Sequence, residues 1–319
     1  MTSRFEYPFK SHFTTVDGIK IHYLDEGRGP VVWLMHGNTS WSYLYRRIIP
    51  ILVEAGYRCF VPDLMGFGLS DIPEKESDYS LQKQVGLMSE LIKRLELRNI
   101  VAVGQDWGGP ISLRYAIEHK DNIKGLVILN TFIERFPSSR KERKEKNIIT
   151  GPLPPGFTLL FKSGAYSSFL IRYLDLFRKF VWMKWRSGNP SILLGAGFRR
   201  PVDPRAMQNY LMIHDKPSKR AGLAVFPKLI PNHAEHPNAA YINEIKKELE
   251  HWNLPVQLIW PDGDMAWKTD EGVRIAQQLP DAAFYLVQNA GHFLQEDAGE
   301  EVAGQLVSFL NSRVYPDKS

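Results

Sequence analysis

The residues around Asp106 have the types and spacing of a reactive turn between a strand and a helix. The segment 104–109 reads Gly-Gln-Asp-Trp-Gly-Gly and follows a run of apolar residues at 100–103. Glycines on both sides of one functional side chain favour a strained turn that leaves no room for a neighbouring β-carbon. The functional side chain here is a carboxylate. Attack of this carboxylate on a saturated carbon would leave an ester that water can open. Asp106 therefore predicts a displacement reaction at an sp3 carbon. The alternative is that the motif is only a surface turn.

Two further polar residues could complete a hydrolytic site with Asp106. Asp264 and His292 each follow an apolar run that is typical of a buried strand. The chain order nucleophile, acid, histidine is that of hydrolases whose nucleophile lies on a strand-to-helix turn. We therefore predict that His292 is a general base and that Asp264 orients its ring. Asp262 and Glu134 stay open as alternative acids, because both lie near the end of a predicted strand.

These residues must be positioned by a parallel sheet. Apolar runs predict buried strands at 31–35, 57–61, 100–103, 125–130, 256–260 and 283–287, and helical spacing predicts helices at 41–55, 81–95, 111–116, 271–278 and 300–310. Alternating residues on both sides of Asp17-Gly18 predict an opening antiparallel hairpin. The alternation of strands and helices along the chain indicates an α/β fold, in which functional residues collect at the carboxyl ends of the strands. Asn38, Asp106 and Asn130 are all expected at that edge.

The regular alternation stops near residue 134. A charged run at 140–146 precedes a segment rich in aromatic residues at 156–185, where many aromatics recur at helical spacing. We predict a first core segment at 1–133, a helical cap at 134–220 and a second core segment at 221–319. The cap would cover an apolar cavity over the sheet edge. Ordinary helix packing and a helix lying on a membrane surface are the alternatives.

Composition narrows the possible classes of protein. The chain has 319 residues, a net charge of +5, 44% hydrophobic and 24% charged residues, and no long apolar run or amino-terminal signal pattern. These values argue against a nucleic-acid partner and against stable membrane insertion. The single cysteine, Cys59, excludes a disulfide within the chain and suits a reducing compartment. We expect a cytoplasmic protein, and an oligomer is compatible with the sequence.

Several of these stretches together resemble the haloalkane dehalogenase family of α/β hydrolases. The matching stretches are residues 36–38 with 42–46, 62–71, 105–109 and 291–293, and the resemblance extends from 12 to 310. It implies an α/β-hydrolase fold, with a mostly parallel eight-stranded sheet, helices on both faces and an inserted helical cap. It also implies hydrolysis of a small apolar haloalkane through an alkyl ester on Asp106. The products would be an alcohol, a halide ion and a proton, and water would be the only co-reactant, with neither cofactor nor metal.

The resemblance assigns two halide donors and an oxyanion site. The side-chain amide of Asn38 and the indole N–H of Trp107 would bind the halide, and the backbone N–H groups of the same two residues would hold the oxyanion. A turn role for Asn38 and a packing role for Trp107 are the alternatives. Two positions depart from many relatives. Some relatives carry the acid as Glu where this chain has Asn130, and many have Pro where it has Thr39.

Other activities share parts of this pattern. Epoxide hydrolases use the same Asp but need phenolic donors, for which Tyr166, Tyr173 and Tyr210 are candidates. A luciferase-like oxygenase shares the motifs around Asn38 and Asp106 but resembles the relatives with Glu in place of Asn130. Fluoroacetate dehalogenases need cationic residues near the nucleophile, where this chain has Trp107 and Pro110. A binding protein on the same scaffold is the non-catalytic alternative.

Overall fold

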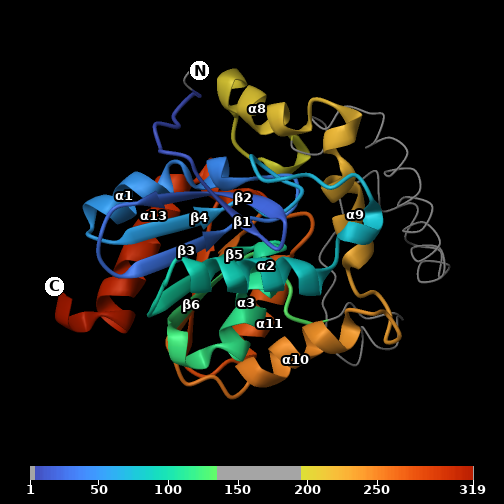
Figure 1. The fold of residues 1–319 in the computed structure, drawn as a ribbon. Coiled ribbons are helices and arrows are strands. Elements are labelled where there is room, and N and C mark those ends of the chain that lie inside the picture. The colour runs from blue at the N-terminus through green and yellow to red at the C-terminus, as the bar shows by residue number, and fades with distance from the viewer. Residues whose placement is uncertain (1–3, 135–194, 319) are drawn as a thin grey trace, which may run out of the picture.

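The computed structural model describes residues 4–134 and 195–318, which form one eight-stranded sheet with helices on both faces (Figure 1). The strand order is β1-β2-β4-β3-β5-β6-β7-β8. The first two pairings, β1 with β2 and β2 with β4, are antiparallel, and the others are parallel. The strands are β1 (His12–Val16), β2 (Ile19–Glu26), β3 (Val31–Met35), β4 (Arg58–Pro62), β5 (Ile100–Gln105), β6 (Ile123–Leu129), β7 (Val256–Pro261) and β8 (Ala282–Val287). The prediction of a mostly parallel eight-stranded sheet is confirmed.

The opening hairpin also agrees with the sequence. Asp17 and Gly18 both have positive φ angles, 48° and 78°, as a two-residue hairpin turn of this type requires. Strands β1 and β2 pair antiparallel on either side of this turn, with Val16 opposite Ile19.

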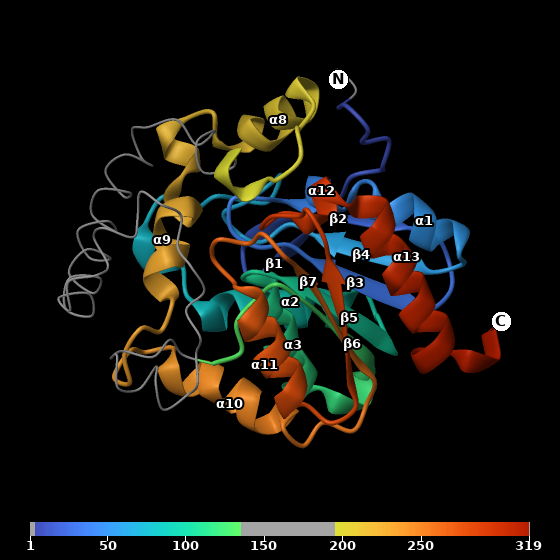
Figure 2. The same cartoon turned by 180° about the vertical axis from the view of Figure 1, so that it is seen from behind.

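The helices form two layers, one on each face of the sheet (Figures 1 and 2). One layer contains α1 and α13, which contact each other, and the other contains α2, α3, α10 and α11. Their bounds are α1 (Ile48–Glu54), α2 (Leu81–Arg94), α3 (Gly108–Glu118), α8 (Pro204–Leu211), α9 (Ala221–Leu229), α10 (Ala239–Leu249), α11 (Thr269–Gln278), α12 (Leu294–Asp297) and α13 (Gly299–Phe309). The predicted helix at 41–55 is in fact a 3-10 turn, Ser42–Tyr45, followed by α1.

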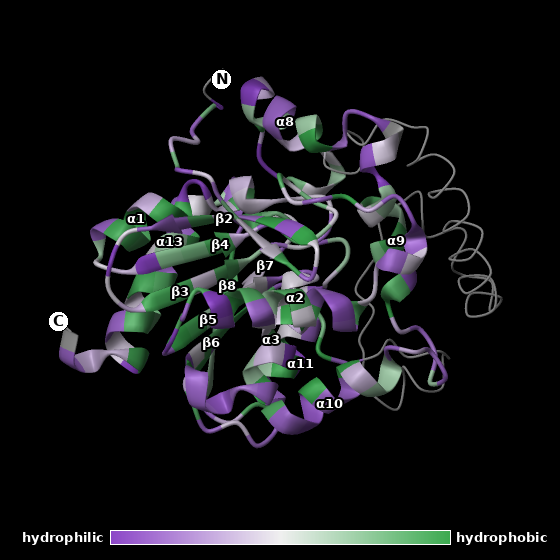
Figure 3. Cartoon of the chain, viewed as in Figure 1, coloured by the Kyte–Doolittle hydropathy of each residue, from purple (hydrophilic) through white to green (hydrophobic). Residues whose placement is uncertain are grey.

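The core explains why the central strands are continuously apolar. In β3 the side chains of Val31, Trp33 and Met35 pack into one cluster, while Val32 and Leu34 pack into the cluster on the opposite face. A strand covered on both faces needs apolar residues at every position. Figure 3 shows this concentration of apolar residues along the central strands.

Residues 135–194, most of the predicted cap, lie outside the described residues, so the predicted division at 134 and 220 remains a prediction. Helix α9 lies across the molecule from the C-terminal residues (Figures 1 and 2). It approaches the loop after β4, where Phe226 meets Phe67 edge to face with ring centroids 4.9 Å apart. No helix among residues 4–134 and 195–318 is long and apolar enough to cross a membrane.

Candidate active site

Asp106 lies on a strained turn between β5 and α3. Its φ angle is +50°, in the left-handed region that residues with a β-carbon rarely adopt. A β-carbon on Gly108 would collide with the backbone of Met35, and one on Gly37 would collide with the side chain of Asp106. The glycines are therefore required by the close approach of β3 and the turn, as the sequence predicts. The Thr131 hydroxyl donates to the carbonyl of Asp106 over 2.5 Å and supports the turn.

The two oxygens of the Asp106 carboxylate have different surroundings. Oδ1 accepts a hydrogen bond of 2.7 Å from the backbone N–H of Asn38, and the backbone N–H of Trp107 also donates to this carboxylate. Oδ2 faces Nε2 of His292 at 3.7 Å and the indole Nε1 of Trp267 at 3.4 Å. The backbone N–H of Asn38 thus holds Oδ1, whereas Oδ2 is the oxygen turned toward the histidine.

The structure brings His292 and Asp264 together. Nδ1 of His292 lies 3.0 Å from Oδ2 of Asp264, and Oδ1 of Asp264 accepts from the backbone N–H of Ala266 over 2.7 Å. Asp264 is buried, which by itself raises a carboxyl pKa. The charge and hydrogen bond of His292, together with the other donors, outweigh burial and lower the pKa of Asp264.

The two alternative acids are directed elsewhere. Asp262 is exposed and its carboxylate accepts from the backbone N–H of Ala290. Glu134 forms ion pairs with Lys246 at 3.3 Å and with Arg274 at 2.5 Å. Among the described carboxylates, Asp264 is therefore the one that contacts Nδ1 of His292.

Two carboxylates set the charge state of His292. Burial, the largest single effect, lowers the pKa of an imidazole, but the adjacent carboxylates of Asp264 and Asp106 more than compensate and raise the pKa of His292 to about 9. Burial also dominates at Asp106, where it raises the carboxyl pKa despite the opposing charge of His292. With a pKa of about 9, His292 carries a positive charge at neutral pH and faces the Asp106 carboxylate.

Two amides position the pair. The Asn130 side-chain N–H2 group donates to Oδ2 of Asp264 over 2.7 Å and to the carbonyl of His292 over 2.8 Å. The Gln105 amide donates to the same carbonyl over 3.1 Å and lies 3.3 Å from Nε2 of His292. The sequence places both residues at strand ends but gives no sign that they hold the histidine.

The predicted halide donors lie beside Asp106. Oδ1 of Asn38 accepts from the backbone N–H of Thr39 over 2.9 Å, which leaves the donor end of the amide available. Phe132 and Phe226 pack edge to face on Trp107, at 5.1 and 5.2 Å between ring centroids. Within residues 4–134 and 195–318, neither the Asn38 amide N–H2 nor the Trp107 indole N–H donates a hydrogen bond. The described part of the chain thus engages neither donor.

Trp267 is a site residue that the sequence reading missed. It follows Asp264 by three residues in the loop between β7 and α11, and its side chain is buried. The only hint in the sequence is an aromatic residue close to a predicted acid. Nothing in that spacing indicates that the indole turns toward Asp106.

The tyrosines considered as epoxide-opening donors do not gather at Asp106. The Tyr210 hydroxyl donates to Glu296 over 2.6 Å and accepts from Arg46 over 3.3 Å, so it belongs to a buried ion pair elsewhere. Tyr166 and Tyr173 lie outside the described residues.

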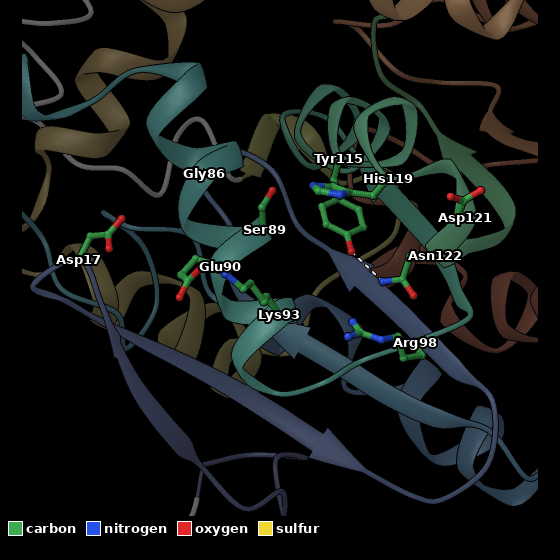
Figure 4. A pocket seen from close by; sticks show the side chains of 10 residues that line it. All are labelled: Asp17, Gly86, Ser89, Glu90, Lys93, Arg98, Tyr115, His119, Asp121 and Asn122. Atoms are coloured by element: carbon green, nitrogen blue, oxygen red, sulfur yellow. Dashed lines mark hydrogen bonds and ion pairs between the residues drawn. The ribbon is translucent and has the colours of Figure 1, made fainter.

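A separate surface pocket runs along α2 and α3 (Figure 4). Its lining includes Glu90 and Lys93 of α2 and Tyr115 of α3, whose hydroxyl accepts from Asn122 over 2.8 Å. It contains charges of both signs and none of the predicted site residues. This pocket is therefore distinct from the candidate active site.

Known proteins resemble this chain over most of its length. The model of the α/β hydrolase fold family matches residues 30–299. A haloalkane dehalogenase of Psychrobacter cryohalolentis is 33% identical over 96% of this chain and 94% of its own. A cis-3-alkyl-4-alkyloxetan-2-one decarboxylase of Shewanella oneidensis is 29% identical over 95% of this chain and 89% of its own.

A solved structure gives the same result. The tetrameric haloalkane dehalogenase DpaA of Paraglaciecola agarilytica has a TM-score of 0.78 and 25% identity, and the match covers 95% of this chain and 94% of that one. The match with the Psychrobacter enzyme combines identity above 30% with nearly full coverage of both chains. The chain therefore belongs to the haloalkane dehalogenase family of α/β hydrolases.

Proposed function

We propose that the protein hydrolyses the carbon–halogen bond of small apolar haloalkanes, and that Asp106 is the nucleophile. The products are an alcohol, a halide ion and a proton. The observation that carries the proposal is the asymmetry of the Asp106 carboxylate. The backbone N–H of Asn38 holds Oδ1, while Oδ2 faces His292.

In the first step, Oδ2 of Asp106 attacks the carbon that bears the halogen. A bond forms between Oδ2 and carbon, the carbon–halogen bond breaks, and its electron pair leaves with the halide. The Asn38 amide and the Trp107 indole donate to the departing halide, because donors aimed at a developing charge in a dry site stabilise the transition state. Asp106 needs no deprotonation, since its partner His292 carries the positive charge.

Alkylation prepares His292 for the second step. The ester on Asp106 has no negative charge, so one of the two carboxylates that raise the pKa of His292 is removed. His292 then loses its proton to solvent, and the neutral imidazole takes a proton from a water molecule, which attacks Cγ of Asp106. Asp264 stabilises the imidazolium that forms.

Collapse of the tetrahedral intermediate releases the alcohol and regenerates Asp106. The negative oxygen of the intermediate is Oδ1, which the backbone N–H of Asn38 already binds in the free protein, and the backbone N–H of Trp107 donates to the same carboxylate. The alkoxide leaves and takes the proton from His292, and the carboxylic acid of Asp106 then passes its proton to His292, which restores the free protein. The one proton released for each halide is the proton that His292 loses after alkylation.

Substrate selection belongs to the cap. We propose that residues 134–220 cover the carboxyl edge of the sheet and shape an apolar cavity above Asp106. This division rests on the change of pattern in the sequence near residue 134. Phe226 of α9, which follows that segment, packs on Trp107 and forms part of the apolar surroundings.

The alternative activities have weaker support. An epoxide hydrolase needs a phenol near the epoxide oxygen, and Tyr210 is engaged with Glu296. A luciferase-like oxygenase resembles relatives with Glu at position 130, where Asn130 here donates to Asp264. The Shewanella relative favours a second candidate, the opening of a cis-oxetan-2-one, in which a carboxylate replaces the halide as leaving group.

A side-by-side assay tests the proposal. The purified protein is given brominated and chlorinated alkanes, an epoxide and a cis-oxetan-2-one, with released halide and organic products measured. Asp106→Ala serves as the blank. We expect halide release that needs Asp106. Turnover of the epoxide or the lactone without any halide release would replace this proposal with one of the alternatives.

We also propose a cytoplasmic location and assembly into an oligomer. Burial raises the pKa of the Cys59 thiol above its usual range, and a buried unreactive thiol suits a reducing compartment. DpaA, which resembles this chain over nearly its full length, is described as tetrameric. Light scattering on the purified protein measures the oligomeric state, and fractionation of the source cells tests the compartment.

A further inference from the structure

A second indole reaches the carboxylate of Asp106. Nε1 of Trp267 lies 3.4 Å from Oδ2, the oxygen that also faces His292. Oδ1 is bound by the backbone N–H of Asn38 at 2.7 Å. Trp267 therefore donates to the oxygen that the proposed function assigns to the attack on carbon.

Packing fixes the Trp267 ring independently of that hydrogen bond. The side chain is buried, and the ring stacks on Phe132 with centroids 5.0 Å apart and planes at 24°. The carbonyl of Trp267 accepts from the indole N–H of Trp260 over 3.0 Å. Because both the ring and the backbone are held, the N–H has a defined direction.

Trp267 and the proposed halide donor Trp107 pack on the same phenyl ring. Phe132, on which Trp267 stacks, also meets Trp107 nearly perpendicularly, with ring centroids 5.1 Å apart. One phenyl ring thus supports two indoles, and both belong to the surroundings of the Asp106 carboxylate.

We propose that Trp267 is a third leaving-group donor, which holds Oδ2 of Asp106 in the free protein and passes its N–H to the departing halide. This inference rests on the proposed function. When Oδ2 bonds to carbon, the carbon–halogen electron pair leaves with the halide, and no proton moves. The new ester oxygen is uncharged and a weaker acceptor than the carboxylate. A buried N–H is unfavourable without an acceptor, and the halide formed in the same step supplies one.

The test removes the N–H and keeps the ring. Trp267→Phe preserves an aromatic ring against Phe132, and Trp252→Phe makes the same change at a buried indole for which we assign no role in the site. We expect Trp267→Phe to slow alkylation of Asp106 about tenfold, measured as the rate of halide release in a single turnover by rapid quench. We also expect kcat/KM to fall more for a chloroalkane than for the matching bromoalkane, because chloride is the poorer leaving group. Trp252→Phe should change neither quantity.

The possible outcomes separate this inference from the proposed function. Absence of halide release by the unaltered protein would refute the proposed function, whatever Trp267 does. Halide release by the unaltered protein, combined with a normal single-turnover rate of halide release by Trp267→Phe, would overturn the inference even if steady-state turnover fell. If Trp267→Phe does not fold, replacement of Trp267 by 3-benzothienylalanine removes the N–H from a ring of the same shape. The same single-turnover measurement then decides.

Discussion

Oδ2 of Asp264 lies 3.0 Å from Nδ1 of His292, although 28 positions separate the two residues in the chain. The contact exists because β7 and β8 are parallel neighbours and the loops that follow both strands meet at one edge of the sheet. Asn130, at the end of β6, donates to both residues and fixes their spacing. This relationship leads to a prediction that separates Asp264 from its close neighbour Asp262.

We expect Asp264→Asn to slow ester hydrolysis by roughly ten thousandfold, because an amide neither stabilises the imidazolium nor enforces the right tautomer. Alkylation should be much less affected, since Asp106 carries it out. Rapid-quench measurement should therefore show a burst of one halide per site followed by very slow turnover. Asp262→Asn is the matched control and should turn over normally. Normal turnover by Asp264→Asn, together with slow ester hydrolysis by Asp262→Asn, would show that Asp262 and not Asp264 orients His292.

The activity should depend on pH through two groups. Alkylation needs ionised Asp106, whose pKa burial raises, so its rate should fall as the pH drops through that raised value. Hydrolysis needs neutral His292, so its rate should rise with pH. Its midpoint should lie below the value of about 9 for the free protein, because the ester removes the charge of Asp106. Single-turnover rates from acid to mildly alkaline pH measure both. A hydrolysis rate that is independent of pH would contradict a histidine base.

Trp107→Phe should reduce kcat/KM by roughly a hundredfold, because it removes one donor to the halide in a dry site. The ring that packs between Phe132 and Phe226 is largely retained. The free energy of unfolding should therefore change little, as urea titration would show. Trp252→Phe again serves as the control. A large loss of stability with unchanged kcat/KM would instead support the packing role for Trp107.

Two glycines make a matched pair for the strained turn. A methyl group on Gly108 would collide with the backbone of Met35, whereas one on Gly86 in α2 would meet nothing. Gly108→Ala should lower the free energy of unfolding by about 1–3 kcal/mol and reduce activity. Gly86→Ala should raise the free energy of unfolding by about 0.5–1 kcal/mol and leave activity unchanged. Equal effects of the two changes would show that the turn is not tightly constrained.

Much of this arrangement could be predicted from the sequence because it follows local rules. The apolar run at β3 indicates a strand covered on both faces, and the glycines around Asp106 indicate a tight turn. Asp106, Asp264 and His292 then meet because parallel strands end at the same edge.

The donors Asn130, Gln105 and Trp267 could not be predicted in the same way. Their roles depend on where a side chain turns after packing, and no periodicity in the sequence records that direction. Trp267 in particular is directed by its stacking on Phe132, which is distant in the chain. A helical spacing of aromatics predicts a cap, but it does not define the cavity that the cap encloses.

The central claim is that Asp106 becomes alkylated during the reaction. His292→Phe should form the ester and fail to hydrolyse it, because the general base is absent. After incubation with a bromoalkane, the mass of the intact protein should increase by one alkyl group, and peptide mapping should place that group on Asp106. An unmodified protein, or the same adduct in a protein that also carries Asp106→Ala, would contradict the account.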